Sequence, residues 1–210
     1  MSYAVKEAFL TLQGEGVQAG SRAVFLRFAG CNLWSGREAD RATAVCRFCD
    51  TDFVGTDGSS GGKFAEAAAL AEHVATLWGP GRLHRLVVVT GGEPMLQFDA
   101  PLLGALHQRG FRVAMESNGT IAASPRTDWL CISPKAGSTV VQRSGDELKL
   151  VWPQQEIDLD DLELWDFANY LIQPMDGPDR AAALAASIAL VMARPRWRLT
   201  LQAHKVVGLP

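Results

Sequence analysis

The chain has 210 residues, of which 48% are hydrophobic and 20% charged, and its formal net charge is −3 at pH 7. This composition is that of a globular protein rather than a disordered one, and the length suits a single domain over residues 1–210. The slightly acidic balance argues against direct binding to nucleic acid. The sequence has no apolar run of about eighteen residues, no signal-peptide pattern and no disulfide scaffold typical of small secreted proteins. We therefore expect a cytoplasmic protein that does not span a membrane.

The first part of the chain predicts two strands separated by a glycine-containing turn. Residues 3–12 mix apolar and polar positions and predict an edge element. The segment T-L-Q-G-E-G at 11–16 follows, and its glycines allow a ligand to approach the backbone closely, although a plain turn fits the spacing equally well. Residues 23–28 predict a strand that contains Arg27. Its pattern alone favours a surface position for this arginine over an anion clamp that points into a cleft.

The next segment holds three of the four cysteines, Cys31, Cys46 and Cys49. The C-x-x-C spacing lets two thiolates of one tight loop reach one metal centre, and Cys31 supplies a third after an excursion at 32–45. Thiolates suit zinc or an iron–sulfur cluster. A structural zinc takes four protein ligands, so it would need a distant fourth such as Cys131 or a histidine. A thioredoxin-like redox pair would leave Cys31 unused, whereas a four-iron cluster with three ligands keeps one iron open.

The remainder of the chain alternates predicted strands with helices and polar turns. A flexible loop at 55–63 precedes a helix over 64–78, a second helix is capped by Asp99 and ends at Gly110, and a third spans 180–193. The predicted strands span residues 86–90, 111–115, 129–132, 146–152, 167–172 and 197–201.

Most of these strands run directly into a Gly-, Pro- or polar-rich turn. The carboxyl ends of parallel strands gather at one edge, where barrels and open α/β sheets hold their active sites. A complete eightfold barrel needs about 250 residues. We therefore predict an α/β fold, a partial, open (β/α) barrel of about six mainly parallel strands with few helices. The turns are G-G-E-P at 91–94, E-S-N-G-T at 116–120, S-P-K at 133–135, Q-P-M-D at 173–176 and Q-A-H-K at 202–205.

The cysteine triad, the G-G-E-P motif and the open parallel barrel together resemble the radical S-adenosylmethionine (SAM) superfamily. Within it, the motifs T-L-Q-G-E-G, E-S-N-G-T, S-P-K and Q-P-M-D, each at a strand end, are similar to the 7-carboxy-7-deazaguanine synthase (QueE) family over residues 9–210. One departure is the excursion at 32–45, which places fourteen residues between the first two cysteines, where the superfamily usually has three. We expect residues 33–44 to loop outward and to carry a surface for an electron donor.

The resemblance implies a 4Fe-4S cluster held by Cys31, Cys46 and Cys49. Its open iron would bind SAM, and the reduced cluster would split SAM into methionine and a 5′-deoxyadenosyl radical. The family also uses Mg2+, for which Thr51 is the matching hydroxyl ligand, with the substrate carboxylate and waters completing an oxygen shell. A flavodoxin or ferredoxin is the implied electron donor, and a homodimer the implied assembly.

The implied SAM contacts lie in the cysteine loop and in four of the strand-end turns. A turn that begins a helix is the alternative interpretation of G-G-E-P, and a plain strand-end turn is the alternative for the E-S-N-G-T segment. The SAM contacts are Phe48, Cys49, Asp50, Gly91, Gly92, Glu93, Glu116, Asn118, Ser133, Pro134, Lys135, Gln173, Pro174, Met175 and Asp176.

The family's substrate is 6-carboxy-5,6,7,8-tetrahydropterin, which implies a ring contraction to 7-carboxy-7-deazaguanine with loss of ammonia, a step towards deazapurines such as queuosine. Arg27 suits the substrate carboxylate because its guanidinium is planar and always charged. The terminal carboxylate of Pro210 suits the amino-pyrimidine edge, whereas a surface position is an equally good interpretation of His204. The implied substrate contacts are Leu12, Gln13, Gly14, Arg27, Thr90, His204 and Pro210.

Two other functions explain part of the sequence. A radical SAM activase, which generates a glycyl radical on a partner protein, would share the cluster and G-G-E-P but would not need the Q-G-E-G loop or a pterin pocket. A zinc-stabilised binding protein would use the cysteines without catalysis. The remaining cysteine, Cys131, lies in an apolar strand and is predicted to belong to the core.

Overall fold

The computed structural model describes residues 2–209 and builds them around one sheet of nine strands. The strands are β1 (Tyr3–Leu12), β2 (Arg22–Phe28), β3 (Gly62–Phe64), β4 (Leu86–Gly91), β5 (Arg112–Ser117), β6 (Trp129–Ile132), β7 (Ser144–Trp152), β8 (Asp166–Pro174) and β9 (Trp197–Leu199). The α-helices are α1 (Ala67–Trp78), α2 (Ala100–Gln108), α3 (Leu159–Glu163), α4 (Arg180–Ala193) and α5 (Ala203–Val207), and two short 3-10 helices are η1 (Glu38–Thr43) and η2 (Pro94–Leu96).

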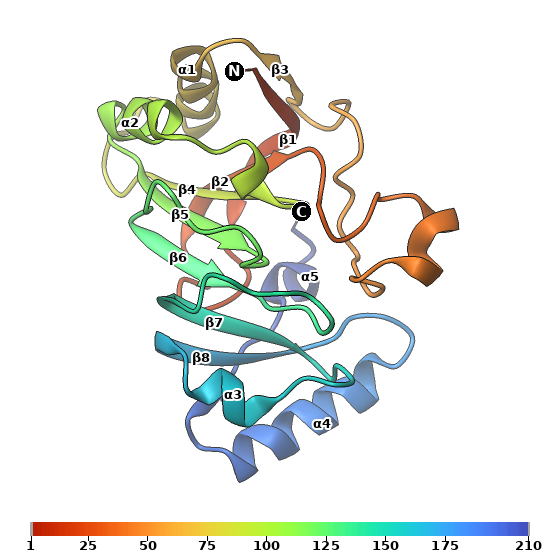
Figure 1. The fold of residues 1–210 in the computed structure, drawn as a ribbon. Coiled ribbons are helices and arrows are strands. Elements are labelled where there is room, and N and C mark those ends of the chain that lie inside the picture. The colour runs from red at the N-terminus through yellow and green to blue at the C-terminus, as the bar shows by residue number, and fades with distance from the viewer. Residues whose placement is uncertain (1, 210) are drawn as a thin grey trace.

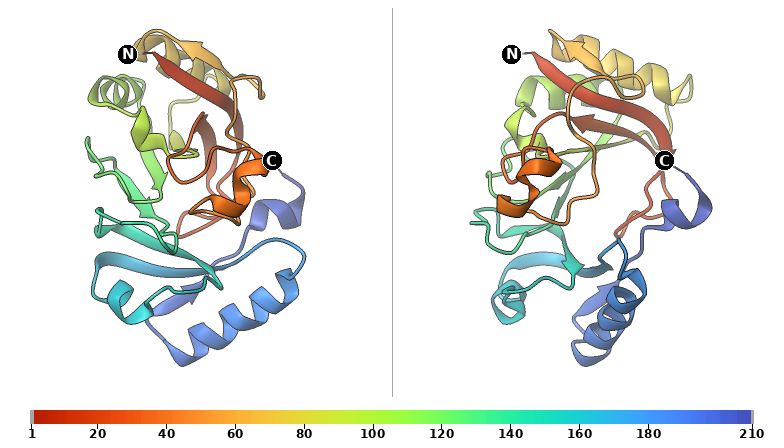
Figure 2. Two further views of the ribbon diagram at one scale, coloured as in Figure 1. Left: turned by 45° about the vertical axis from the view of Figure 1, so that its right-hand side comes forward. Right: turned by 90° about the vertical axis from the view of Figure 1, so that its right-hand side faces the viewer.

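The strand order is β3-β1-β2-β4-β5-β6-β7-β8-β9. From β2 to β9 every neighbouring pair is parallel, whereas β1 pairs antiparallel with both β2 and β3 at one edge. The sheet curves into a half-barrel (Figure 1, Figure 2). The barrel is open because β3 and β9 end the order without pairing with each other. This confirms the predicted α/β class and the open, mainly parallel barrel.

The two faces of the sheet differ in what they bury. Side chains alternate between faces along a strand, so in β7 Leu148 and Leu150 join the main hydrophobic core while Glu147 and Lys149 point into the barrel. Helices α1, α2 and α4 cover the outer face (Figure 1, Figure 2). The inner face carries a smaller apolar cluster and many buried polar groups. These polar groups are available to line a binding site inside the barrel.

Several predicted elements differ in detail from the structure. The sheet has nine strands rather than about six, because β1 and β2 join the same sheet as the later strands and the short strand β3 extends its edge. Residues 3–12 are not an edge strand, since β1 is flanked by β2 and β3. The first helix begins at Ala67 instead of Phe64, which ends β3, and the last strand stops at Leu199. The helix predicted over 180–193 matches α4.

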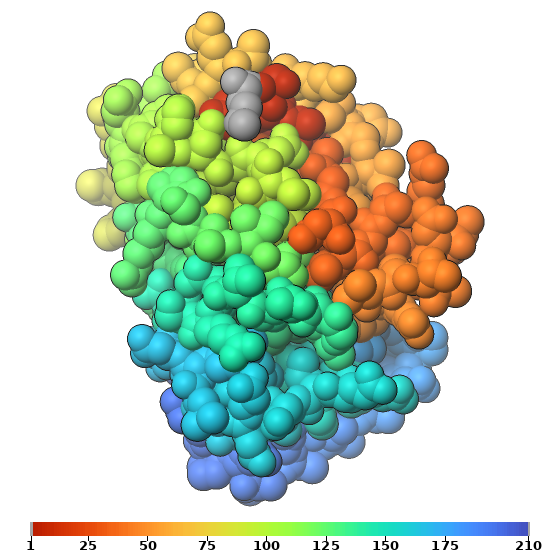
Figure 3. Space-filling view, in the orientation of Figure 1, coloured from red at the N-terminus to blue at the C-terminus, as the bar shows by residue number. Residues whose placement is uncertain are grey.

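The excursion at 32–45 includes η1 and projects from one side of the molecule (Figure 1, Figure 3). Within residues 2–209, none of the helices is both long and apolar enough to cross a bilayer.

Candidate active site

A pocket of about 610 Å³ opens where the predicted strand-end turns meet. Its wall is built from the ends of β2, β4, β5, β6, β7 and β8, from the cysteine segment and from the C-terminal segment. This is the edge at which parallel α/β sheets place ligands. The strands thus bring motifs separated by up to the full chain length to one cavity.

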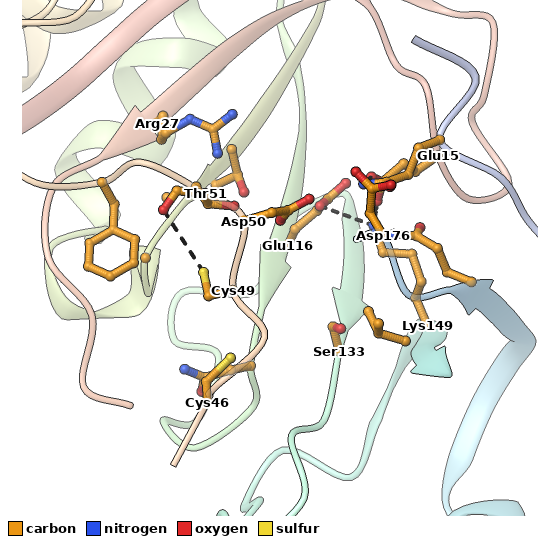
Figure 4. Close-up of a pocket in the computed structure, with 18 of the residues that line it drawn as sticks. Glu15, Arg27, Cys46, Cys49, Asp50, Thr51, Glu116, Ser133, Lys149 and Asp176 are labelled. Carbon is orange, nitrogen blue, oxygen red and sulfur yellow. Dashed lines mark hydrogen bonds and ion pairs between the residues drawn. The ribbon is translucent and has the colours of Figure 1, made fainter. Parts of the chain in front are cut away.

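Three cysteine side chains, those of Cys31, Cys46 and Cys49, line this pocket, and two of them appear in Figure 4. A hydrogen bond with the Cys46 thiol lowers the pKa of Cys49 to about 6, and the same interaction raises the pKa of Cys46 well above its usual range. The sulfur of Cys31 accepts a hydrogen bond from the backbone N–H of Leu33, at 3.4 Å. The pocket therefore gathers three thiols, one of them poised to ionise near neutral pH.

The donor set suits an iron–sulfur cluster, because all three side chains are thiols. Among residues 2–209, no three His, Cys, Asp or Glu side chains come together as a site for one metal ion. A four-iron cluster is wider than an ion and takes thiolate ligands from around its rim, which matches three cysteines that ring one cavity. Cys131 is buried elsewhere, with its thiol 3.5 Å from a carboxylate oxygen of Glu147, and does not line this pocket.

The excursion is tied firmly to the cysteine loop. The backbone N–H groups of Val45 and Cys46 both donate to the carbonyl oxygen of Leu33, which closes the base of the excursion. The Arg41 guanidinium lies 4.1 Å from the centre of the Trp34 ring and donates to the carbonyl oxygens of Arg47 (2.9 Å) and Cys49 (3.1 Å). One arginine therefore holds the backbone at two points within the C-x-x-C turn.

The G-G-E-P turn brings the backbone against Cys31. A Cβ atom on Gly92 would lie 2.6 Å from the Cβ of Cys31, and one on Gly91, whose φ is +145°, would lie 2.4 Å from the carbonyl oxygen of Phe28. Only glycine fits such an approach. Glu93 is fully buried and accepts hydrogen bonds from the backbone N–H of Asn118, so this carboxylate ties the turn to the end of β5. Burial raises the pKa of Glu93.

Arg27 points into the pocket rather than to the surface (Figure 4). Its Nε donates to a carboxylate oxygen of Glu7 at 2.8 Å. Across the pocket the C-terminal segment docks on the first loop, because the N–H of Ala203 donates to the carbonyl oxygen of Gly14 at 2.8 Å. A Cβ on Gly14 would lie 2.1 Å from Nδ1 of His204, so this glycine makes the docking possible.

Charged groups occupy the floor and the mouth of the pocket. The Lys149 side chain is 4% exposed and its ammonium forms ion pairs with Glu15 and Glu116 on the floor. At the mouth, Lys205 on α5 bridges Asp50 (2.8 Å) and Asp176 (2.6 Å).

No family model matches the chain, but whole-length relatives do. The chain is 59% identical to the 7-carboxy-7-deazaguanine synthase of Caulobacter vibrioides and 57% identical to that of Burkholderia multivorans, and both alignments cover 100% of each chain. The chain belongs to the 7-carboxy-7-deazaguanine synthase family. The crystal structure of QueE from Escherichia coli has a TM-score of 0.72 and 26% identity, with 97% of this chain and 95% of that chain covered.

Membership of the 7-carboxy-7-deazaguanine synthase family confirms the resemblance inferred from the strand-end motifs. It favours the synthase over the activase and over the zinc-stabilised binding protein.

Most residues predicted for the synthase site line the pocket. Three do not: Glu93 lies buried behind it, and Pro134 and Gly14 stand next to lining residues; Pro210 lies outside the described residues. The residues that line it are Leu12, Gln13, Arg27, Cys31, Cys46, Phe48, Cys49, Asp50, Thr51, Thr90, Gly91, Gly92, Glu116, Asn118, Ser133, Lys135, Gln173, Pro174, Met175, Asp176 and His204.

Several polar residues of this pocket were not among the predicted site residues, including Glu15, Lys149, Gln202 and Lys205. A signal existed for two of them. Glu15 stands between two glycines of a turn already singled out, and Lys149 interrupts an apolar strand, where a charge needs a buried partner. The mouth residue Lys205 belongs to the Q-A-H-K turn at 202–205, but its ion pairs could not be predicted because its partners come from distant parts of the chain.

Proposed function

We propose that the protein is a 7-carboxy-7-deazaguanine synthase that converts 6-carboxy-5,6,7,8-tetrahydropterin into 7-carboxy-7-deazaguanine and ammonia. The observation that carries this proposal is that three cysteines and the strand-end motifs of one enzyme family line a single pocket of about 610 Å³. That volume lies within the range of small-molecule sites.

Cys31, Cys46 and Cys49 would hold a 4Fe-4S cluster, which together with SAM supplies the radical chemistry. The chain's own contribution would be to hold the three thiolates around one cavity. The glycines at 91 and 92 let the G-G-E-P backbone come close to Cys31 and to the end of β2. Because the excursion closes on itself at Leu33, the two distant halves of the triad stay together despite the long insertion.

SAM would bind between the cysteine loop and the ends of β5, β6 and β8. On this side Lys135 donates to the carbonyl and hydroxyl oxygens of Ser133, both at 2.7 Å, and lies 6.0 Å from the centre of the Phe48 ring. Glu116 and Asn118 are placed for the ribose, and residues 173–176 for the adenosine, in line with the family resemblance.

The pterin would bind on the side of Arg27 and the first loop. Its carboxylate would pair with the guanidinium, which Glu7 already orients, and Thr51 would contribute a hydroxyl to a Mg2+ ion shared with that carboxylate. Phe9 and Phe25 stack at 5.8 Å in the same wall and give the flat ring an apolar surface.

Two partner surfaces accompany this proposal. The excursion projects beside the cluster loop and offers a reduced flavodoxin or ferredoxin a short route to the cysteines. On α4 the exposed side chains Leu184, Ile188 and Met192 recur at every fourth residue, and this apolar stripe supports a homodimer. The expected cytoplasmic location suits an oxygen-sensitive cluster with free thiols.

The proposal is tested by reconstituting the protein with iron and sulfide without oxygen, and by following SAM cleavage after reduction. We expect a brown protein that forms 5′-deoxyadenosine, and we expect C31A, C46A and C49A each to lose both properties. The matched control is C131A, which removes a cysteine outside the pocket and should keep the cluster. A colourless protein that binds zinc instead would overturn the proposal.

A further inference from the structure

A closed ring of hydrogen bonds lies on the floor of the pocket. The Lys149 ammonium is 2.5 Å from Oε2 of Glu15 and 3.2 Å from Oε2 of Glu116 (Figure 4). Gln13 completes the ring, because its Nε2 donates to Oε1 of Glu116 (2.9 Å) and its Oε1 accepts from the backbone N–H of Glu15 (3.1 Å). Four residues from the first loop, β5 and β7 thus form one connected unit.

In this ring one buried ammonium, that of Lys149, forms ion pairs with two carboxylates. Burial alone would lower the pKa of Lys149, but Glu116 and Glu15 hold it well above its usual range. Burial likewise raises the pKa of Glu15, and the Lys149 ammonium more than reverses this effect. The pKa directions of Lys149 and Glu15 thus both favour the charged ion pair. Without the ammonium, two carboxylates would face each other in a site that shields them poorly, and their positions would change.

The two carboxylates belong to opposite halves of the pocket. Glu116 is the next-to-last residue of β5, close to the Asn118 backbone that Glu93 fixes to the G-G-E-P turn, and this is the half assigned to SAM. Glu15 belongs to the first loop, and Gln202 of the C-terminal segment donates to its Oε1 at 3.0 Å. That half is assigned to the pterin. Lys149 is the only group within the ring that pairs with both carboxylates.

We propose that Lys149 is a positioning residue that couples SAM binding to pterin binding, an inference that rests on the proposed function. A ligand that orders one carboxylate also orders the ammonium, and thereby the second carboxylate on the other side. Each ligand then binds a site already arranged for it. Such coupling is reciprocal, so the pterin tightens SAM binding by the same factor by which SAM tightens pterin binding.

The test measures SAM affinity by anaerobic calorimetry on the reconstituted protein, with and without 6-carboxytetrahydropterin. The cluster stays oxidised, so no turnover occurs. We expect the pterin to tighten SAM binding by about tenfold in the wild-type protein, within the usual range of coupling. In K149M, which keeps the length of the side chain and removes its charge, this factor should fall to about one. The matched control is K63M, because Lys63 is an exposed lysine on β3, and it should retain the wild-type factor.

If K149M binds both ligands more weakly but keeps the wild-type coupling factor, Lys149 has a purely structural role and the inference is overturned. Should K149M fold poorly, K149M/E15Q removes both charges of the more buried pair and leaves only Glu116, whose side chain is 22% exposed, without its ammonium; this variant should also lose the coupling. Wild-type protein that binds both ligands independently would overturn the inference alone. Wild-type protein that binds neither would overturn the proposed function and the inference with it.

Discussion

The Ser117 hydroxyl lies 2.9 and 3.0 Å from the two carboxylate oxygens of Glu93, in the buried interior behind the pocket. The same carboxylate accepts from the backbone N–H groups of Met95 (2.9 Å) and Asn118 (2.8 Å). One side chain thus joins the turn after β4 to the turn after β5. Two strand ends that face the pocket are held as a single rigid part, which is what precise placement of a ligand requires.

This buried carboxylate predicts a pH dependence of stability. Burial raises the pKa of Glu93 in the folded protein above its unfolded value, which is about 4.3. The folded state therefore binds more protons than the unfolded state above about pH 4.3, and the contribution of Glu93 to stability falls as pH rises through its folded pKa. Urea unfolding at several pH values should show the free energy of unfolding of the wild-type protein falling relative to that of E93Q. The control E66Q changes an exposed glutamate and should keep the wild-type slope. Parallel curves for wild type and E93Q would contradict this prediction.

The strands and turns that carry the site could be predicted from the sequence because each follows local rules. Buried parallel strands such as β4 are continuous apolar runs, and glycine, proline and asparagine mark the turns after them. The edge strand β3 and the helix α5 could not be predicted, because they are short and depend on docking against β1 and the first loop. The ring around Lys149 was missed for the same reason, since its members come from three distant segments.

Arg41 is expected to stabilise the cysteine loop. Replacing it with methionine removes the hydrogen bonds to the carbonyl oxygens of Arg47 and Cys49 and the contact with Trp34. We expect the free energy of unfolding of R41M to be about 1–2 kcal/mol lower than that of the wild-type protein. We also expect R41M to retain less iron and sulfide per chain after reconstitution. The control is R82M, which changes an exposed arginine outside the site. Wild-type iron content in R41M would show that the contacts of Arg41 are not needed for cluster binding.

Thr51 is expected to bind magnesium through its hydroxyl. The substitution T51V keeps the shape of the side chain and removes the oxygen ligand, so magnesium should no longer stimulate turnover while the cluster content stays unchanged. T76V removes the hydroxyl of an exposed threonine on α1 and serves as the control. An unchanged response of T51V to added magnesium would exclude this role.

Gly14 is expected to be needed for docking of the C-terminal segment. In G14A the new Cβ would meet the His204 ring at 2.1 Å and its Cβ at 2.8 Å, so α5 must shift. Trypsin should then cleave after Lys205 faster than in the wild-type protein, and the KM for the pterin should rise. G81A adds a methyl group where nothing lies within 4 Å and should behave as wild type. Equal cleavage rates in G14A and wild type would mean that the segment tolerates the clash.

The central claim is that the pocket carries out the ring contraction. The reduced, reconstituted protein is incubated without oxygen with SAM, magnesium and 6-carboxytetrahydropterin, and the products are followed by mass spectrometry together with an ammonia assay. The account predicts 7-carboxy-7-deazaguanine and ammonia in equal amounts. Deoxyadenosine formed without either product would contradict the assigned substrate and would leave only the SAM cleavage in place.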